Sequence, residues 1–400
     1  MGVTKKVEYF DNIFKDFLRK NFDKICIFIL LLLSVFIRIF LFDFVSIDAN
    51  DYLIPWYDEI VQKGRIAALT DQIGNYNMTY QLLIVLLSYI PIKPLYAYKI
   101  LSCVFDYVLG YAVGIAVYRL TGSRLKRWTS FFLVVFSPIV IINSACWGQC
   151  DSIYVSFCIL TIIAFIDNKE YLPFIYYGFA LAFKLQAIFL FPLMLIIWWR
   201  SHKYTVAHFF MIPITMVVIC LPNIIIGHRN VKEIVGIYMD QTGRYERISM
   251  NYPSFWNILV AQAEGDLFTV LKKVAVVFTV FVLLMIVIYV EKRQISLGVE
   301  NILHLAMITV FTCVLFLPAM HERYSFMYEI IALILLMRYL DSVKALIPMY
   351  IITLLDYSDF LFGHDILSQY NFVFAIVNIC IYLYYAKWFI TKREAKYEDS

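Results

Sequence analysis

Charged side chains are scarce in this sequence. Only 16% of its 400 residues are Asp, Glu, Lys or Arg, whereas 62% are hydrophobic. Soluble globular chains carry about a quarter charged residues and about half apolar residues. The composition therefore excludes an ordinary soluble domain and indicates an integral membrane protein.

Cysteine patterns typical of zinc sites are missing too. Six of the eight cysteines lie mostly inside apolar runs, where cysteine acts as a small hydrophobic residue: Cys26, Cys103, Cys158, Cys220, Cys313 and Cys380. Only Cys146 and Cys150 come together near an expected membrane surface, where a disulfide is one alternative. Residues 1–24 are long and charged, and the apolar run behind them is long enough to remain as an anchor, so we expect no cleavable signal peptide.

Long apolar runs dominate the sequence instead. A membrane-crossing helix needs about 20 apolar residues. Runs near that length, or shorter but convincing, cover 25–44, 95–119, 128–144, 150–166, 205–226, 267–290, 299–317, 325–339, 344–358 and 369–388. The apolar stretch 171–199 is interrupted at 183–186 and is taken as two short spans. The sequence thus predicts a single all-α, polytopic domain over 1–400 with about twelve membrane helices.

Positive charge predicts the orientation. Residues 1–24 hold six cations, so this segment is expected in the cytoplasm: Lys5, Lys6, Lys15, Arg19, Lys20 and Lys24. If the short run 79–91 is a helix lying at the membrane interface, the basic connection 119–128 and the tail 389–400 are also cytoplasmic. The first extracytoplasmic loop is then 45–94, with juxtamembrane helices. The other polar stretches, 147–151, 227–256 and 320–324, face the same outer side of the cell membrane.

Five charges lie within or at the ends of apolar runs: Arg38, Lys99, Asp106, Asp151 and Lys184. Each costs about 2.5–3.5 kcal/mol at the centre of a membrane helix. We therefore expect them to be paired or to face water. Asp106 is predicted to pair with Arg38 or Lys99 and so to lock helices together. Lys184 and Gln186 lie at the interruption of a span, a place where polar ligands bind, although a lysine there can also reach outward to the surface.

The first outer loop, "SIDANDYLIPWYDEI", carries acids directly after the first span. A carboxylate there can act as a general base or help to hold a divalent cation, and Asp48 and Asp51 are the candidates. Asp58 and Glu59 are better explained as the solvated side of an amphipathic helix over 56–68. No metal ligand set and no certain cofactor follow from this pattern.

Three other outer stretches carry further candidates. In "WGQCD", Trp147, Gln149 and Asp151 either line a wet cavity or cap a turn at the bilayer edge. In "MHERY", Arg323 offers a fork of donors that matches a phosphate, with His321 and Glu322 beside it, or the segment is a basic anchor at the headgroups.

The loop 227–256 combines amides, arginines and aromatic rings, which suit a carbohydrate, although a plain interfacial loop has the same composition. Its candidates are Gln241, Arg244, Tyr245, Arg247, Asn251, Tyr252 and Trp256.

These stretches, in their order, resemble the bacterial relatives of the GPI-anchor second mannosyltransferase, within the GT-C class of polytopic glycosyltransferases. The matching segments are "SIDANDYLIPWYDEI", "GNYNMTYQLL", "PLYAYKILSCVFDY", "WGQCDSIY", "GFALAFKLQAIFLFPL", "NYPSFWNIL" and "MHERYSF". They extend from about residue 36 to 330. The family usually has a proline where Leu185 stands and an asparagine where Ser254 stands.

The resemblance implies a GT-C fold and transfer of a sugar, expected to be a mannose-like hexose, from a polyprenyl-phosphate donor. The acceptor would be an extracytoplasmic glycan or glycolipid, with inversion at the anomeric carbon and Asp48 as the catalytic base. Membrane lipid is an expected partner, and nucleic acid is not. Two other classes stay open: a secondary transporter, and a polymerase or ligase of the cell envelope.

Overall fold

The computed structural model describes residues 3–243, 247–259, 265–340 and 343–398. These residues form helices, and their only extended pairing is a bridge between Ser249 and Met320. The predicted all-α class is confirmed.

The helices follow one another in chain order. The first half contains α1 (Val3–Phe40), η1 (Ala49–Leu53), α2 (Ile54–Gln62), η2 (Arg65–Thr70), α3 (Met78–Leu87), α4 (Pro94–Thr121), α5 (Arg124–Val135), α6 (Pro138–Ile141), η3 (Ile142–Trp147), α7 (Asp151–Ile166), α8 (Leu172–Phe183), η4 (Leu185–Leu190) and α9 (Phe191–Arg200). The second half contains α10 (Val206–Phe209), α11 (Met211–Ile219), α12 (Leu221–Ile225), α13 (Glu233–Gly243), α14 (Trp256–Leu259), α15 (Gly265–Lys292), α16 (Val299–Phe316), α17 (Phe326–Leu336), α18 (Val343–Phe362), α19 (Ile366–Gln369) and α20 (Asn371–Glu398).

Several of these helices are suited to a membrane. In the described residues, five are long and apolar enough to cross one, and the bent pair 124–135 and 138–147 makes a sixth if it counts as one span. The chain is thus compatible with a polytopic membrane protein. Residues 79–91 supply only the ten-residue α3, which is about 15 Å long and too short to cross a hydrocarbon core of about 30 Å.

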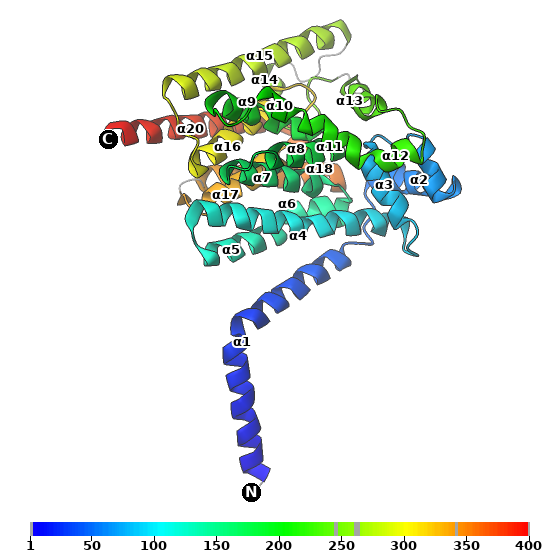
Figure 1. Ribbon diagram of the computed structural model, residues 1–400, viewed down its shortest axis with the longest axis vertical. Coiled ribbons are helices and arrows are strands. Elements are labelled where there is room, and N and C mark those ends of the chain that lie inside the picture. Colours follow the sequence, from blue (N-terminus) through cyan, green and yellow to red (C-terminus); the bar gives the residue numbers. More distant parts are fainter. Residues whose placement is uncertain (1–2, 244–246, 260–264, 341–342, 399–400) are drawn as a thin grey trace.

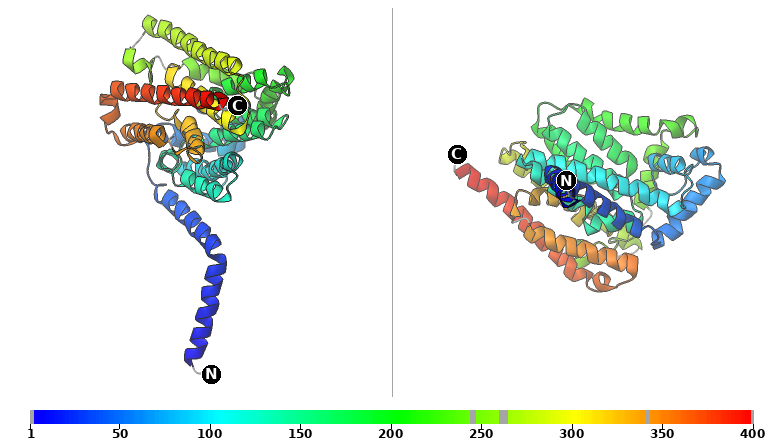
Figure 2. Two further views of the ribbon diagram at one scale, coloured as in Figure 1. Left: turned by 90° about the vertical axis from the view of Figure 1, so that its left-hand side faces the viewer. Right: turned by 90° about the horizontal axis from the view of Figure 1, so that it is seen from below.

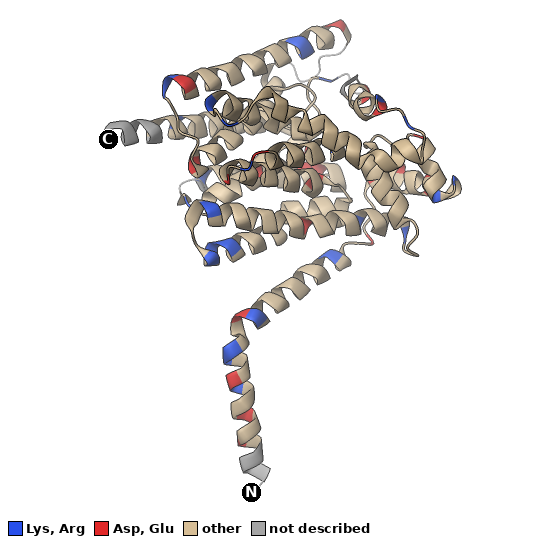
Figure 3. Ribbon diagram, in the orientation of Figure 1, with Lys and Arg blue, Asp and Glu red and all other residues tan. Residues whose placement is uncertain are grey.

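The helices pack into one body from which α1 projects (Figures 1 and 2). Helix α16 lies at the centre, with 89% of its most apolar stretch buried, whereas α15 lies at the edge with 17% buried. Figure 3 shows that most charges of α1 lie on the part of the helix that is away from the body, with a basic residue near its C-terminal end as the exception. The short elements η1, α2, η2 and α3 lie together at one end of the bundle, next to α12 (Figure 1).

The predicted pairing of Asp106 is confirmed, with Arg38 as its partner. The Arg38 guanidinium donates from Nε to Asp106 Oδ2 at 3.0 Å, and its Nη2 lies 2.9 Å from the same oxygen in an ion pair. Ser144 and Ser152 also donate to this carboxylate, at 2.5 and 2.6 Å. All four side chains are buried, so the network ties α1 to α4, η3 and α7.

Lys99 does not pair with Asp106, which was the other predicted arrangement. Its ammonium donates to three backbone carbonyl oxygens just beyond the end of α1, at 3.0, 3.0 and 2.6 Å: Leu41, Phe42 and Phe44. The last carbonyls of a helix have no partner within the helix, and a cation beside them is favourable. Lys99 is fully buried and fixes the chain four residues before Asp48. Cys146 and Cys150 are buried and not bridged.

Candidate functional site

A cavity of about 350 Å³ opens beside the group of short helices, within the volume range of small-molecule sites. Its wall comes from the segment after α1, the loop before α3, the turn before α7, the break after α8, helix α15 and the segment between α16 and α17. The polar lining residues are Asp48, Tyr52, Asn75, Tyr76, Gln149, Lys184, Gln186, Gln241, Lys272, His321, Arg323 and Tyr324. Among the described residues that line this cavity, Asp48 is the only acid.

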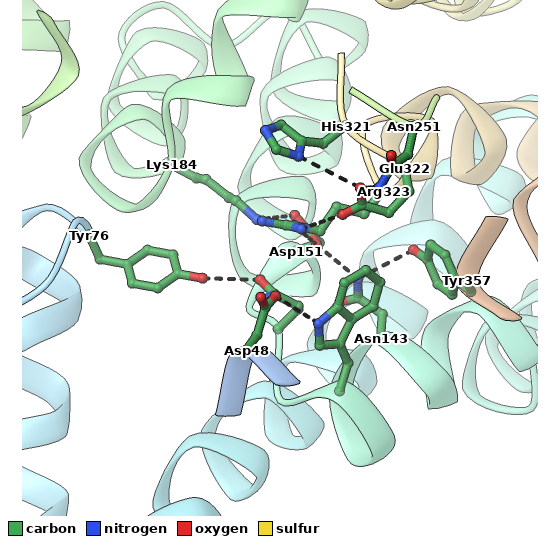
Figure 4. A network of polar contacts seen from close by, with 12 residues as sticks. Asp48, Tyr76, Asn143, Asp151, Lys184, Asn251, His321, Glu322, Arg323 and Tyr357 are labelled. Atoms are coloured by element: carbon green, nitrogen blue, oxygen red, sulfur yellow. Dashed lines mark hydrogen bonds and ion pairs between the residues drawn. The ribbon is translucent and has the colours of Figure 1, made fainter. Parts of the chain in front are cut away.

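Asp48 is held by the turn that precedes α7 (Figure 4). Trp147 Nε1 and Gln149 Nε2 both donate to Asp48 Oδ2 at 2.9 Å. Tyr76 in turn donates from its hydroxyl to Gln149 Oε1 at 3.0 Å. No described residue donates to Asp48 Oδ1, so one carboxylate oxygen is anchored and the other is left for a ligand.

The turn before α7 requires its glycine. Gly148 has φ +84°, a left-handed conformation that glycine adopts without penalty, and an added Cβ would lie 3.3 Å from Leu53 Cδ1. The reversal brings Trp147 and Gln149 to Asp48 on one side of the turn. On its other side Asp151 enters the first turn of α7. Asp151 does not cap this turn, which was one of the two predicted roles. Its carboxylate contacts side chains from other segments instead.

Asp151 lies behind the cavity wall and holds its cations. Lys184 Nζ forms an ion pair with Oδ1, Asn143 donates to Oδ2 at 2.8 Å, and Arg323 Nε lies 3.9 Å from Oδ2. Asp151 is fully buried and does not itself line the cavity, whereas Gln149 does. Of the two residues that the sequence predicts at a cavity wall, only Gln149 therefore lies there.

Lys184 lies at a true helix break. Helix α8 ends at Phe183, Lys184 is extended with φ −152°, and η4 begins with the next residue. Lys184 is buried against Asp151 and lies 5.8 Å from the ring of Tyr154, so it does not reach outward to the surface. Gln186 lines the cavity beyond the break, and its Oε1 accepts no hydrogen bond from the described residues.

The "MHERY" segment places a second cation beside the first. Arg323 donates from Nη1 to Glu322 Oε1 at 2.6 Å, and its guanidinium lies 5.3 Å from the centre of the Trp147 ring. Asn251 donates to Glu322 at 3.3 Å, and His321 Nδ1 lies 3.6 Å from it. Burial raises the pKa of Glu322, but the His321 hydrogen bond and the Arg323 charge outweigh burial and lower it to about 2. Glu322 is therefore an anion that fixes Arg323.

Several candidates lie outside this network. Asp51 is exposed and accepts a hydrogen bond from its neighbour Asn50 at 2.9 Å. Trp256 is buried in a separate apolar cluster with Ile248 and Phe268, and its indole donates to the Phe316 carbonyl at 2.7 Å.

Asn251 is exposed and reaches the network only through Glu322, and Arg247 is exposed as well. Arg244 and Tyr245 lie outside the described residues.

Several members of the site were not among the predicted residues. Burial raises the pKa of Tyr76 well above the usual value, so its hydroxyl stays a donor. Asn143 and Tyr357 hold the far side of Asp151, with 3.3 Å between the Asn143 amide and the Tyr357 hydroxyl. Tyr324 lines the cavity. A buried amide at the end of an apolar run, as in "VIINSACW", is the signal that could have identified Asn143.

The described residues of this site offer few ligands for a metal ion. No group of three or more His, Cys, Asp or Glu in the described residues is arranged to hold a metal ion. A divalent cation in the cavity would find one protein carboxylate, that of Asp48.

Comparison with known proteins gives no match, either to a family model or to a curated sequence.

Proposed function

We propose that this chain is a GT-C-type membrane glycosyltransferase with about twelve membrane helices, which transfers a hexose from a polyprenyl phosphate to an extracytoplasmic glycan or glycolipid. The observation that carries the proposal is the pairing of one oriented carboxylate, Asp48, with two cations, Lys184 and Arg323, around a single cavity. A hexose that resembles mannose is the first sugar to test.

The residues suit an inverting displacement. The acceptor hydroxyl oxygen attacks the anomeric carbon from the face opposite the phosphate, and its proton passes to the free Oδ1 of Asp48. The bond between the anomeric carbon and the phosphate oxygen breaks, and polyprenyl phosphate leaves. Lys184 and Arg323 stabilise the charge on that phosphate, while Asp151 and Glu322 keep both cations in place. Trp147 and Gln149 hold Oδ2 and so fix the direction in which Oδ1 points.

A secondary transporter is the second candidate, because the broken helix at Lys184 and the buried charges are also features of transporters. A polymerase or ligase is the third. The three classes differ in the lipid product: a glycosyltransferase of this type releases polyprenyl phosphate, a ligase releases the diphosphate, and a transporter releases neither.

The test uses the purified full-length protein in lipid nanodiscs with polyprenyl-phosphate mannose and a cell-envelope glycolipid extract. We expect polyprenyl phosphate to appear only when the extract is added. Asp48→Asn keeps the size of the side chain and its hydrogen bonds to Trp147 and Gln149 but removes the base. It should therefore lower turnover by about 10²–10⁴-fold with donor binding retained. The exposed Asp51→Asn should be milder, and Asp58→Asn is a matched control with unchanged turnover.

Normal turnover in Asp48→Asn would remove the first outer loop from the mechanism. A defect confined to Asp51→Asn would move the base there. Uptake of substrate into proteoliposomes without any lipid product would favour the transporter.

A further inference from the structure

Two buried acids in the bundle lack a cation. Asp356 on α18 is 2% exposed and Glu329 on α17 is 1% exposed. Asp106, Asp151 and Glu322 are equally buried, but each forms an ion pair with an arginine or lysine. No Lys, Arg or His in the described part of the chain forms an ion pair with Glu329 or Asp356.

The two acids lie at one helix interface with two hydroxyl groups. Thr353 bonds through its hydroxyl to Glu329 Oε1 and to Ser325 Oγ, the latter at 3.0 Å. Ser325 immediately precedes α17, and Glu329 lies one turn further along that helix. Thr353 and Asp356 are three residues apart on α18 and so share a face. Ser325, Thr353 and Glu329 therefore meet where α17 packs on α18, and Asp356 follows one turn along α18, near enough for the charge of Glu329 to act on it.

Part of this oxygen set is unused. Glu329 Oε2 and Asp356 Oδ2 are buried, and neither has a hydrogen-bond partner among the described residues. The charged groups whose fields reach Asp356 are Glu322, Asp359 and Glu329, which are all acids. Buried polar atoms are almost always satisfied, and an uncompensated buried charge is costly. The site is thus short of a positive charge and of a partner for two oxygens.

We propose that Glu329 and Asp356, with the hydroxyls of Ser325 and Thr353, bind a monovalent cation of the size of Na⁺. All four groups supply hard oxygen ligands. Ca²⁺ takes about 6–8 oxygens and Mg²⁺ usually keeps several waters, which four side chains in a closed helix interface do not provide. This site is distinct from the cavity and does not depend on the proposed function. Protonation of Glu329 and Asp356 would compete with binding of the cation.

The test is cation-dependent stability of the purified full-length protein in detergent. Thermal unfolding would be followed at fixed pH in NaCl, KCl and choline chloride of equal ionic strength, together with binding of ²²Na⁺. We expect Na⁺ to raise Tm above its value in choline, with a saturating dependence on concentration, because an ion that binds only the folded state stabilises it. Saturable ²²Na⁺ binding should accompany the shift.

Variants assign the effect to these residues. Thr353→Val keeps the shape of the side chain but loses the oxygen and should abolish the Na⁺ shift, whereas Thr353→Ser keeps the oxygen and should retain it. Asp356→Asn should abolish ²²Na⁺ binding, and Asp58→Asn, at an exposed acid, should not.

Equal Tm values in NaCl and choline, with no bound ²²Na⁺, would show that the acids simply hold protons and would overturn the proposal. Stabilisation by MgCl₂ or CaCl₂ but not by NaCl would also overturn it. A Na⁺ shift that survives in both Thr353→Val and Asp356→Asn would place the ion elsewhere.

Discussion

The junction of α1 with α4 and the wall of the cavity both contain buried charges, but they use them differently. At the junction, Arg38, Asp106 and Lys99 are fully enclosed, and their partners are other parts of the chain. At the cavity, Lys184 and Arg323 have an acid behind them and empty space in front. A charge in an apolar helix is therefore a poor marker of a site by itself. A charged side chain that borders a cavity, and that is held in place by a buried residue of opposite charge, is a better marker of a functional site.

The largest expected difference between the two regions is in stability. Asp106→Ala leaves the Arg38 guanidinium buried without its carboxylate and should lower the free energy of unfolding by about 3–5 kcal/mol. The double variant Arg38→Met/Asp106→Leu removes both charges and should recover most of that loss. Denaturation in detergent, followed by tryptophan fluorescence, measures both. Equal stability of wild type and Asp106→Ala would contradict the role of this pair as a lock between helices.

At the cavity the expected loss is in ligand binding. Arg323→Ala should weaken binding of the phosphate-linked donor by about 2–5 kcal/mol, and Arg323→Lys should restore only part of it, because an ammonium lacks the planar fork of donors. Binding of polyprenyl-phosphate mannose to nanodiscs is the measurement. Unchanged donor binding in both variants would return the "MHERY" segment to the role of a headgroup anchor.

Glu322 should give the cavity region a pH signature. Its pKa in the folded protein is about 2, below the usual value of 4.5, so its contribution to stability is fully present above about pH 4.5 and is lost as the pH falls toward 2. The difference in Tm between wild type and Glu322→Gln should therefore shrink as the pH falls below about 4.5. A difference that already declines between pH 8 and 6 would point to another titrating group.

The smallest effect on function is expected from single cysteine substitutions at exposed positions, which report the orientation of the protein in the membrane. In a background without the accessible Cys26 and Cys380, the substitutions Asp58→Cys and Lys232→Cys should be labelled from outside the cell by an impermeant thiol reagent. Arg124→Cys should be labelled only after permeabilisation. Labelling of Arg124→Cys in intact cells would reverse the orientation and place the cavity on the cytoplasmic side.

Local features of this molecule were predictable from the sequence. The helical class follows from the apolar runs, the break at Lys184 from the polar residues inside one of them, and the Arg38–Asp106 pair from the cost of a lone charge in lipid. Each of these inferences depends on one segment or on a strong energetic penalty.

Contacts between distant segments were not predictable. The bond from Trp147 to Asp48 joins residues 99 positions apart and depends on how the helices pack. Asp51 is a candidate base because it lies three residues after Asp48, but it belongs to η1, a π-helical turn with i to i+5 hydrogen bonds, and its side chain is exposed. Trp256 was assigned to a sugar site because its neighbours are polar, yet an indole with one carbonyl partner suits an apolar core equally well.

The three carbonyl oxygens around the Lys99 ammonium resemble the oxygen cage of a potassium ion, with the ion replaced by a side chain on a covalent tether. A tethered charge cannot be chelated, diluted or exchanged. The backbone that leads to Asp48 should therefore hold its shape in any salt, so a dependence of this protein on particular ions must originate elsewhere in the chain.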